Sequence, residues 1–165
     1  ALIAVGNDIK EDHAHLAQLL FDHYEANIHT DAILYEGMET VLKAIEDAGL
    51  TWGIVTNRPE FLTFPLLPHL NLPSAPACVV CGDTTKRSKP HPDPLIHAYT
   101  LLNKPPEQCL FVGDSIRDIQ AGKAAGMKTV AAIYGYIEKH DNPNNWQADY
   151  SISAPKDLLE LIGKY

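Results

Sequence analysis

Two aspartates, Asp114 and Asp118, stand where the apolar run of LFVGDSIRDI ends. Their spacing of four residues brings both carboxylates to one side of the helix that this stretch predicts. Two carboxylates held this close repel each other unless a cation lies nearby, and Mg²⁺ prefers oxygen ligands and keeps several waters. A structural alternative stays open, in which Asp114 caps the helix and Asp118 interacts with the helix dipole. The stretch alone predicts either a magnesium site or a helix start.

Two other stretches carry groups that suit a phosphate. In VTNRP, Thr56 and Asn57 follow an apolar run, and a hydroxyl with free backbone N–H groups at a helix start can cradle a phosphate. RSKPHPDP carries Arg87 and Lys89 in a proline-stiffened loop, where a lysine can balance phosphate charge as a compact cation. Each stretch has an ordinary alternative, which is a polar strand exit for the first and a solvated basic loop for the second.

The elements that must position these residues alternate along the chain. The sequence predicts strands in 51–57, 77–83, 109–114, 128–135 and 150–154. It predicts helices in 37–50, 59–70 (broken by Pro65 and Pro68), 93–103 (with Asp93 as N-cap and Pro94 in the first turn), 115–126 (ended by Gly126) and 155–165. This alternation predicts an α/β fold with a doubly wound, Rossmann-like, mostly parallel sheet and helices on both faces.

In such a sheet, ligands bind beyond the carboxyl ends of the strands. This rule puts Thr56, Asn57, Asp83, Asp114 and Gly135 on one rim. The first thirty residues are mostly helical in pattern, and we expect their four histidines to be solvated or hydrogen-bonded rather than metal ligands.

Composition limits the partners of the protein. The 165 residues are 45% hydrophobic and carry a net charge of -8, with no basic stripe for nucleic acid and no apolar run of membrane length. Cys78 and Cys81 form a C-x-x-C pair, but they fall within a β-branched run, so we expect packed thiols rather than a zinc or redox site. Reduced thiols suit the cytoplasm.

Taken together, the order Thr-Asn, then Lys, then Gly-Asp…Asp resembles the haloacid dehalogenase superfamily of phosphatases. The resemblance runs from GMETVLKAIEDAGL through GYIEKHD and is greatest to the phosphoglycolate phosphatase group. The tail GYIEKHDNPNNWQADYSI is particularly similar to bacterial phosphatases that act on N-acetylmuramic acid 6-phosphate.

The resemblance implies a role for each rim residue. Thr56 would hydrogen-bond the phosphoryl group with help from the N–H of Asn57, and Lys89 would neutralise charge on the phosphate and the nucleophile. Asp114 would bind Mg²⁺, and Asp118 would support the metal or orient Lys89. The implied reaction is Mg²⁺-dependent hydrolysis of a small phosphorylated metabolite through an aspartyl-phosphate, by a monomer or homodimer.

One motif of that superfamily is missing from the chain. D-x-D-G-T, which supplies the nucleophile and the general acid and base, does not occur, and neither does any D-x-D. We expect residues 1–35 to be the C-terminal part of a helical cap domain. Residues 36–165 would then be a core without its first, central strand, which would lie between the strands that end at Thr56 and Asp114. We therefore expect these 165 residues alone to be inactive and the nucleophile to lie upstream of them.

Alternatives remain open at this stage. A receiver-type signalling module uses similar groups, but in the reverse chain order. A catalytically inactive relative that serves as a binding module, or a phosphosugar mutase of the same superfamily, would also fit. The substrate stays open between 2-phosphoglycolate and N-acetylmuramic acid 6-phosphate, and His91 and Tyr136 could line its pocket or face solvent.

Overall fold

A computed structural model describes residues 33–137 and 139–163, which form an α/β fold. The α-helices are α2 (Met38–Asp47), α3 (Glu60–Thr63), α4 (Asp93–Leu101), α5 (Ile116–Ala124) and α6 (Leu159–Ile162). The strands are β1 (Ile54–Val55), β2 (Val79–Val80), β3 (Leu110–Gly113), β4 (Lys128–Ala132) and β5 (Tyr150–Ile152). Short 3-10 helices are η1 (Leu67–His69), η2 (Pro106–Gln108), η3 (Pro143–Asn145) and η4 (Pro155–Leu158). The expected alternation is confirmed, whereas the helix and histidines expected in the first thirty residues lie outside the described part.

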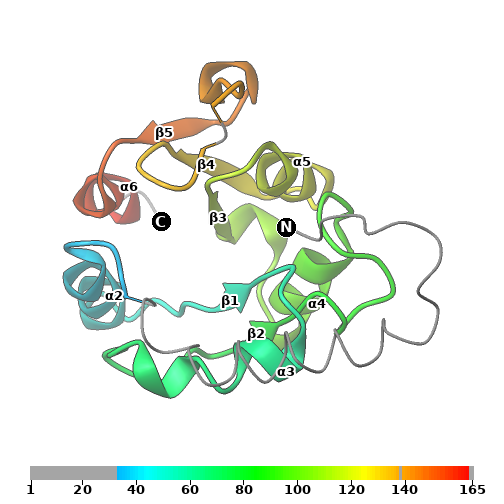
Figure 1. The fold of residues 1–165 in the computed structure, drawn as a ribbon. Helices are drawn as coiled ribbons and strands as arrows, with labels where there is room; N and C mark the ends of the chain where they lie inside the picture. The colour runs from blue at the N-terminus through cyan, green and yellow to red at the C-terminus, as the bar shows by residue number, and fades with distance from the viewer. Residues whose placement is uncertain (1–32, 138, 164–165) are drawn as a thin grey trace, which may run out of the picture.

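The strands form two parallel sheets (Figure 1). One sheet pairs β1 with β2, and the other has the order β3-β4-β5. Among the described residues, β1 and β3 each pair along one edge only. The sheets are nevertheless joined through packing, because Val55 of β1 and Phe111 of β3 contact the same buried cluster around Leu95 and Ala121.

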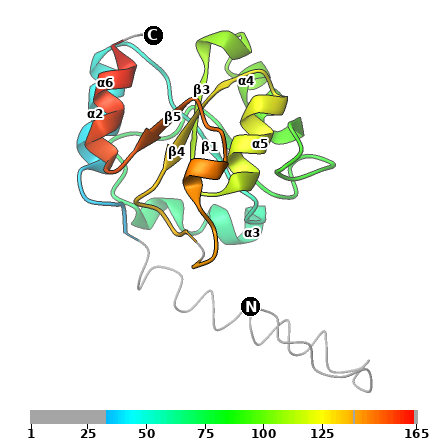
Figure 2. The same cartoon turned by 90° about the horizontal axis from the view of Figure 1, so that it is seen from above.

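Helices cover both faces of the strands, as the doubly wound fold requires. Figure 2 shows α2 and α6 on one side and α4 and α5 on the other. Side chains alternate accordingly along β3: Leu110 and Val112 pack toward the cluster of α2 and α6, and Phe111 packs toward α4 and α5. Val41 and Val130 in the first cluster are fully buried, and each such side chain contributes about 1.5–3 kcal/mol of hydrophobic stabilisation.

The helix boundaries follow their local sequence with one exception. Gly49 and Gly126 have φ of 70° and 78° just after α2 and α5, so these glycines end the helices, as predicted for Gly126. The prediction that Asp93 caps α4 is wrong, because Pro92 is the N-cap and Asp93 is the first helical residue. Its carboxylate instead accepts hydrogen bonds from Nε and Nη2 of Arg87, each at 2.9 Å.

The predicted strands at 51–57 and 77–83 are present but shorter than expected. Each contributes two residues to the ladder, in the register Ile54 opposite Val79 and Val55 opposite Val80. Hydrogen bonding extends one step beyond the ladder, since the N–H of Thr56 donates to the carbonyl of Val80 at 2.8 Å. The ends of both stretches then turn toward the candidate site.

Asp149 links β4 to the segment before β5. Its carboxylate accepts hydrogen bonds from Lys128 Nζ and from the N–H and Oγ1 of Thr129, each at 2.9 Å. The Lys128 ammonium, followed by the Thr129 donors, lowers the pKa of Asp149 to about 2. Within the described residues, no helix is long and apolar enough to cross a bilayer.

Candidate active site at the strand ends

The turn between β3 and α5 positions both aspartates of GDSIRD. Ser115 is the N-cap of α5, and its Oγ accepts a hydrogen bond from the N–H of Arg117 at 3.3 Å. Asp118 returns the interaction, because its Oδ2 accepts from the N–H of Ser115 at 3.2 Å. The structural alternative in which Asp114 caps this helix is therefore wrong. The S-x-x-D spacing is a capping-box signal that the sequence already carried.

Lys89 and Asp118 form a buried ion pair at the centre of the site. Lys89 Nζ lies 2.8 Å from Asp118 Oδ1, and the two side chains are 9% and 11% exposed. The ammonium also donates to the carbonyl of Val55 at 2.8 Å and lies 5.3 Å from the centre of the Phe111 ring. Lys89 thus connects the open edge of β1 to the end of β3. The contact brings Lys89 and Asp118 together, and the role of Asp118 in orienting the lysine stays a prediction.

Asp114 directly follows β3 on the rim, four residues before Asp118. Its Oδ2 accepts a hydrogen bond from the N–H of Tyr136 at 2.9 Å, and Oδ1 has no hydrogen-bond partner among the described residues. Gly135 makes this approach possible, because a Cβ at Gly135 would collide with the Cβ of Asp114. Gly113 likewise makes room for Asp118, because a Cβ at Gly113 would collide with the Asp118 side chain. Sequence reasoning placed Gly135 on the rim but missed this steric reason.

Thr56 presents its hydroxyl at the end of β1. Thr56 Oγ1 accepts a hydrogen bond from the N–H of Arg58 at 3.0 Å. In the part of the chain that the structure describes, the hydroxyl proton has no protein acceptor, so it remains available to donate to a ligand oxygen. This arrangement suits a phosphoryl oxygen.

Asn57 contacts Lys89 instead of pointing away from it. Its side-chain amide hydrogen-bonds both the N–H and the carbonyl of Lys89, at 3.0 and 2.9 Å. Sequence reasoning grouped the two residues as phosphate ligands but did not predict that they touch. They lie 32 positions apart, so no local pattern reports the contact.

Several other predicted site residues have different tasks. Arg87 forms an ion pair with Asp93, whereas Lys89 pairs with Asp118. Asp83 stays at the rim, where its Oδ1 accepts from the N–H of Glu60 at the start of α3. His91 is exposed, and Tyr136 is 86% exposed beside Asp114.

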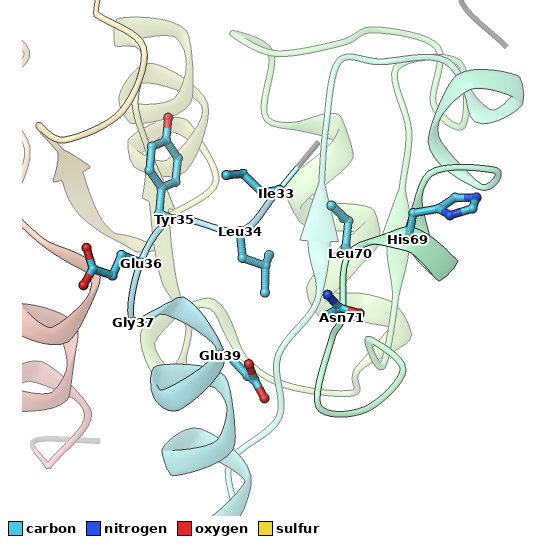
Figure 3. A pocket seen from close by; sticks show the side chains of 9 residues that line it. All are labelled: Ile33, Leu34, Tyr35, Glu36, Gly37, Glu39, His69, Leu70 and Asn71. Carbon is cyan, nitrogen blue, oxygen red and sulfur yellow. The ribbon is translucent and has the colours of Figure 1, made fainter. Parts of the chain in front are cut away.

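A pocket of about 260 Å³ lies between the segment before α2 and the loop after η1 (Figure 3). It is lined by Ile33, Leu34, Tyr35, Glu36, Gly37, Glu39, His69, Leu70 and Asn71. None of the rim residues lines this pocket, so the candidate active site is identified by the polar groups at the strand ends and not by the pocket. Tyr35 does reach toward the rim, since its ring meets that of Tyr134 edge-on with centroids 5.0 Å apart. Burial, then the nearby Tyr35 and Asp114, raises the pKa of Tyr134.

The rim offers oxygen donors for a divalent cation. Asp114 has one carboxylate oxygen outside any hydrogen bond that the described residues make, whereas Asp118 uses one oxygen for Lys89 and the other for Ser115. No group of three acidic, histidine or cysteine ligands occurs within the described residues. Since Mg²⁺ commonly binds through one or two carboxylates and retained waters, Asp114 fits such an ion.

The chain is similar to several known proteins. Residues 4–132 match the family model for haloacid dehalogenase-like hydrolases. The chain is 43% identical over 141 residues to an N-acetylmuramic acid 6-phosphate phosphatase of Pseudomonas putida, covering 86% of this chain and 63% of that protein. It is 45% identical over 137 residues to a phosphoglycolate phosphatase of Xanthomonas campestris pv. campestris, covering 83% of this chain and 62% of the relative.

A solved structure is similar in fold. The crystal structure of a predicted phosphoglycolate phosphatase from Haemophilus somnus superposes with a TM-score of 0.86 at 26% identity, over 92% of this chain and 67% of that one. The chain spans less than two thirds of the length of the two curated relatives.

Proposed function

Since the chain belongs to the haloacid dehalogenase-like hydrolases, we propose that it forms most of a Mg²⁺-dependent phosphatase for a small phosphorylated metabolite. The names of the relatives support a phosphomonoester as the substrate class, because they include phosphatases of N-acetylmuramic acid 6-phosphate and of phosphoglycolate. The similarity of the tail favours the phosphorylated amino sugar.

The observation that carries the proposal is the buried Lys89–Asp118 pair at the strand ends, with Asp114 at the end of β3, four residues before Asp118. A lysine that is 9% exposed and held by a carboxylate and a carbonyl is a fixed positive charge. Fixed charges stabilise developing negative charge without reorganisation, which is the main requirement of phosphoryl transfer.

Each rim residue then has a task toward the phosphate. The Thr56 hydroxyl donates to a phosphoryl oxygen, the Lys89 ammonium balances phosphate charge, and Asp118 holds that ammonium in place. Asp114 would hold the metal ion. When bound, Mg²⁺ would supply Lewis-acid stabilisation of charge on the phosphoryl oxygens.

The proposal includes a nucleophilic aspartate outside these residues. Its carboxylate oxygen would bond to phosphorus as the ester oxygen leaves, and water would then cleave the aspartyl-phosphate to release inorganic phosphate. The strand that carries it would lie between β1 and β3, where both edges lack a partner among the described residues. Residues 36–165 would be the core around that strand, and residues 1–35 would belong to a cap.

The decisive experiment is a phosphate-release panel with the protein in its full natural length. It compares N-acetylmuramic acid 6-phosphate with 2-phosphoglycolate, each with Mg²⁺ and with EDTA. We expect release that requires Mg²⁺ and falls at least about hundredfold in Asp114→Asn, because the variant loses the metal-binding charge. Asp47→Asn, an exposed change at the end of α2, is the matched control and keeps the wild-type rate.

Absence of phosphate release from every phosphomonoester tested would contradict the proposal and favour an inactive relative. Release that survives EDTA and Asp114→Asn would contradict the metal assignment alone. The cytoplasmic location and the monomeric or homodimeric state remain predictions. The free thiols of Cys78, Cys81 and Cys109 are compatible with a reducing compartment.

A further inference from the structure

We propose that Asn57 is a positioning residue that fixes Lys89 through the lysine backbone, and that its side chain does not bind phosphate. The inference rests on the proposed function for its catalytic consequence, but the positioning itself stands on contacts within the described residues. Asn57 Nδ2 donates to the carbonyl of Lys89 at 2.9 Å, and the N–H of Lys89 donates to Asn57 Oδ1 at 3.0 Å.

The two hydrogen bonds act as a clamp because they hold both polar groups of one residue. The lysine backbone offers one donor and one acceptor, and an asparagine amide is complementary to both. The amide orientation is fixed by this match, since a flipped amide would place donor against donor. The acceptor and one donor of the Asn57 side chain are thereby used, which leaves its backbone N–H for the phosphate.

The loop that carries Lys89 needs such an anchor. Residues 83–92 contain no helix or strand, so no regular backbone ladder sets the position of this lysine. Beyond the loop's own turns, Asp83 and Thr84 at its start are hydrogen-bonded to Glu60 of α3, and Arg87 ties it to the start of α4 through Asp93. The Asn57 clamp joins the backbone of Lys89 itself to the segment after β1. The Lys89 side chain must then meet three groups at once, which are the carbonyl of Val55, the Asp118 carboxylate and the Phe111 ring.

Gly82 packs closely against the backbone of Asn57. A Cβ at Gly82 would collide with the carbonyl of Asn57, and the N–H of Gly82 donates to the carbonyl of Arg58 at 2.9 Å. The end of β2 therefore supports the turn that bears the clamp. A chain of fixed contacts runs from Gly82 through Asn57 to Lys89.

Three variants separate a clamp from a phosphate ligand. Asn57→Ala removes both hydrogen bonds, and Asn57→Asp keeps the acceptor for the Lys89 N–H but loses the donor to its carbonyl. Lys89→Met removes the ammonium. Asn144→Ala is the control, because the exposed side chain of Asn144 makes no hydrogen bond to the other described residues.

Kinetics on the full natural protein give the first readout. A misplaced catalytic group can lower the rate by up to about a hundredfold, so we expect Asn57→Ala to lower kcat at least about tenfold and Asn57→Asp by a smaller factor. In the Lys89→Met background, Asn57→Ala should change the remaining rate by less than about twofold, because a residue that acts through Lys89 has nothing left to position. An undiminished effect in that background would overturn the proposal and assign the Asn57 side chain to phosphate.

Nuclear magnetic resonance of the lysine ammonium groups gives a second readout that does not depend on activity. A buried ammonium with two protein acceptors exchanges slowly with water, so Lys89 should give a resolved signal that Lys89→Met removes. We expect Asn57→Ala to shift or broaden that signal and Asn144→Ala to leave it unchanged.

The two readouts also separate the two proposals. An unchanged Lys89 signal in both Asn57 variants would overturn the positioning role, whatever the kinetics. A shifted signal in a wild-type protein that releases no phosphate would support the clamp and reject the phosphatase.

Discussion

The buried ion pair of Lys89 and Asp118 leads to a sharp prediction about stability. Replacing Asp118 by Asn removes the negative charge and leaves an ammonium that is 9% exposed without a carboxylate. Breaking one side of a buried pair costs about 3–5 kcal/mol, because the remaining charge stays desolvated. We expect the lower end, about 3 kcal/mol, since the carbonyl of Val55 and the Phe111 ring still face the ammonium.

The chain provides a matched pair for comparison. Arg87 and Asp93 lie equally close, at 2.9 Å, but their side chains are 55% and 24% exposed. Solvent and salt screen such a pair, so Asp93→Asn should change stability far less than Asp118→Asn. Both changes replace one carboxylate by an amide of the same shape, whose oxygen can still accept the hydrogen bond that Ser115 donates to Asp118, so burial of the ion pair is the main difference between them.

The assay is urea unfolding followed by circular dichroism. With a slope of about 2 kcal/mol per molar urea, a loss of about 3 kcal/mol lowers the midpoint by about 1.5 M. The double variant Lys89→Met with Asp118→Asn should be more stable than Asp118→Asn alone, because it buries no unpaired charge. The reasoning would be refuted if Asp118→Asn lowered the midpoint no more than Asp93→Asn does.

Two further predictions concern the rim and the link between β4 and β5. Gly135→Ala should lower phosphatase activity at least about tenfold and weaken Mg²⁺ binding, because the added methyl group displaces Asp114, and a normal rate would contradict the steric argument. Gly163→Ala, where a Cβ meets nothing within 4 Å, is the control. The pKa of Asp149 is lowered to about 2 in the folded protein. Its contribution to the free energy of unfolding is therefore present above the unfolded pKa near 3.8 and disappears as pH falls through about 2. The full shift corresponds to about 2.4 kcal/mol, which partial exposure reduces to about 1 kcal/mol, and urea unfolding of wild type and Asp149→Asn should differ by that amount at pH 6 and converge near pH 2. If the difference in unfolding free energy between wild type and Asp149→Asn stayed the same from pH 6 to pH 2, ionisation of Asp149 would not be its cause.

Much of the fold was predictable because it depends on local pattern. The β-branched runs, the glycines after α2 and α5 and the prolines around α4 report backbone preferences that act within a few residues. The rule for the carboxyl ends of parallel strands then brought Thr56 and Asp114 to one edge. The prediction for Asp93 failed because the local helix pattern does not show its ion pair with Arg87.

The parts of the site that could not be predicted depend on tertiary contacts. Two partners of Lys89 lie more than thirty positions away from it in the sequence. One is the carbonyl of Val55, which accepts a hydrogen bond from the ammonium, and the other is the Asn57 amide, which clamps the lysine backbone. The sequence showed that these residue types could serve a phosphate, but not which of them touch. It also left open whether Asp118 serves the metal or the lysine, and the ion pair favours the lysine.

The central claim is that Lys89 is the fixed cation of a phosphoryl-transfer site. Its most direct test is the kcat for phosphate release by the full natural protein and by Lys89→Met, with saturating Mg²⁺ and the better substrate of the panel. We expect a fall of at least about hundredfold, because the variant keeps most of the length of the side chain but loses the charge that stabilises the transition state. A Lys89→Met variant that folds and releases phosphate at the wild-type rate would contradict it.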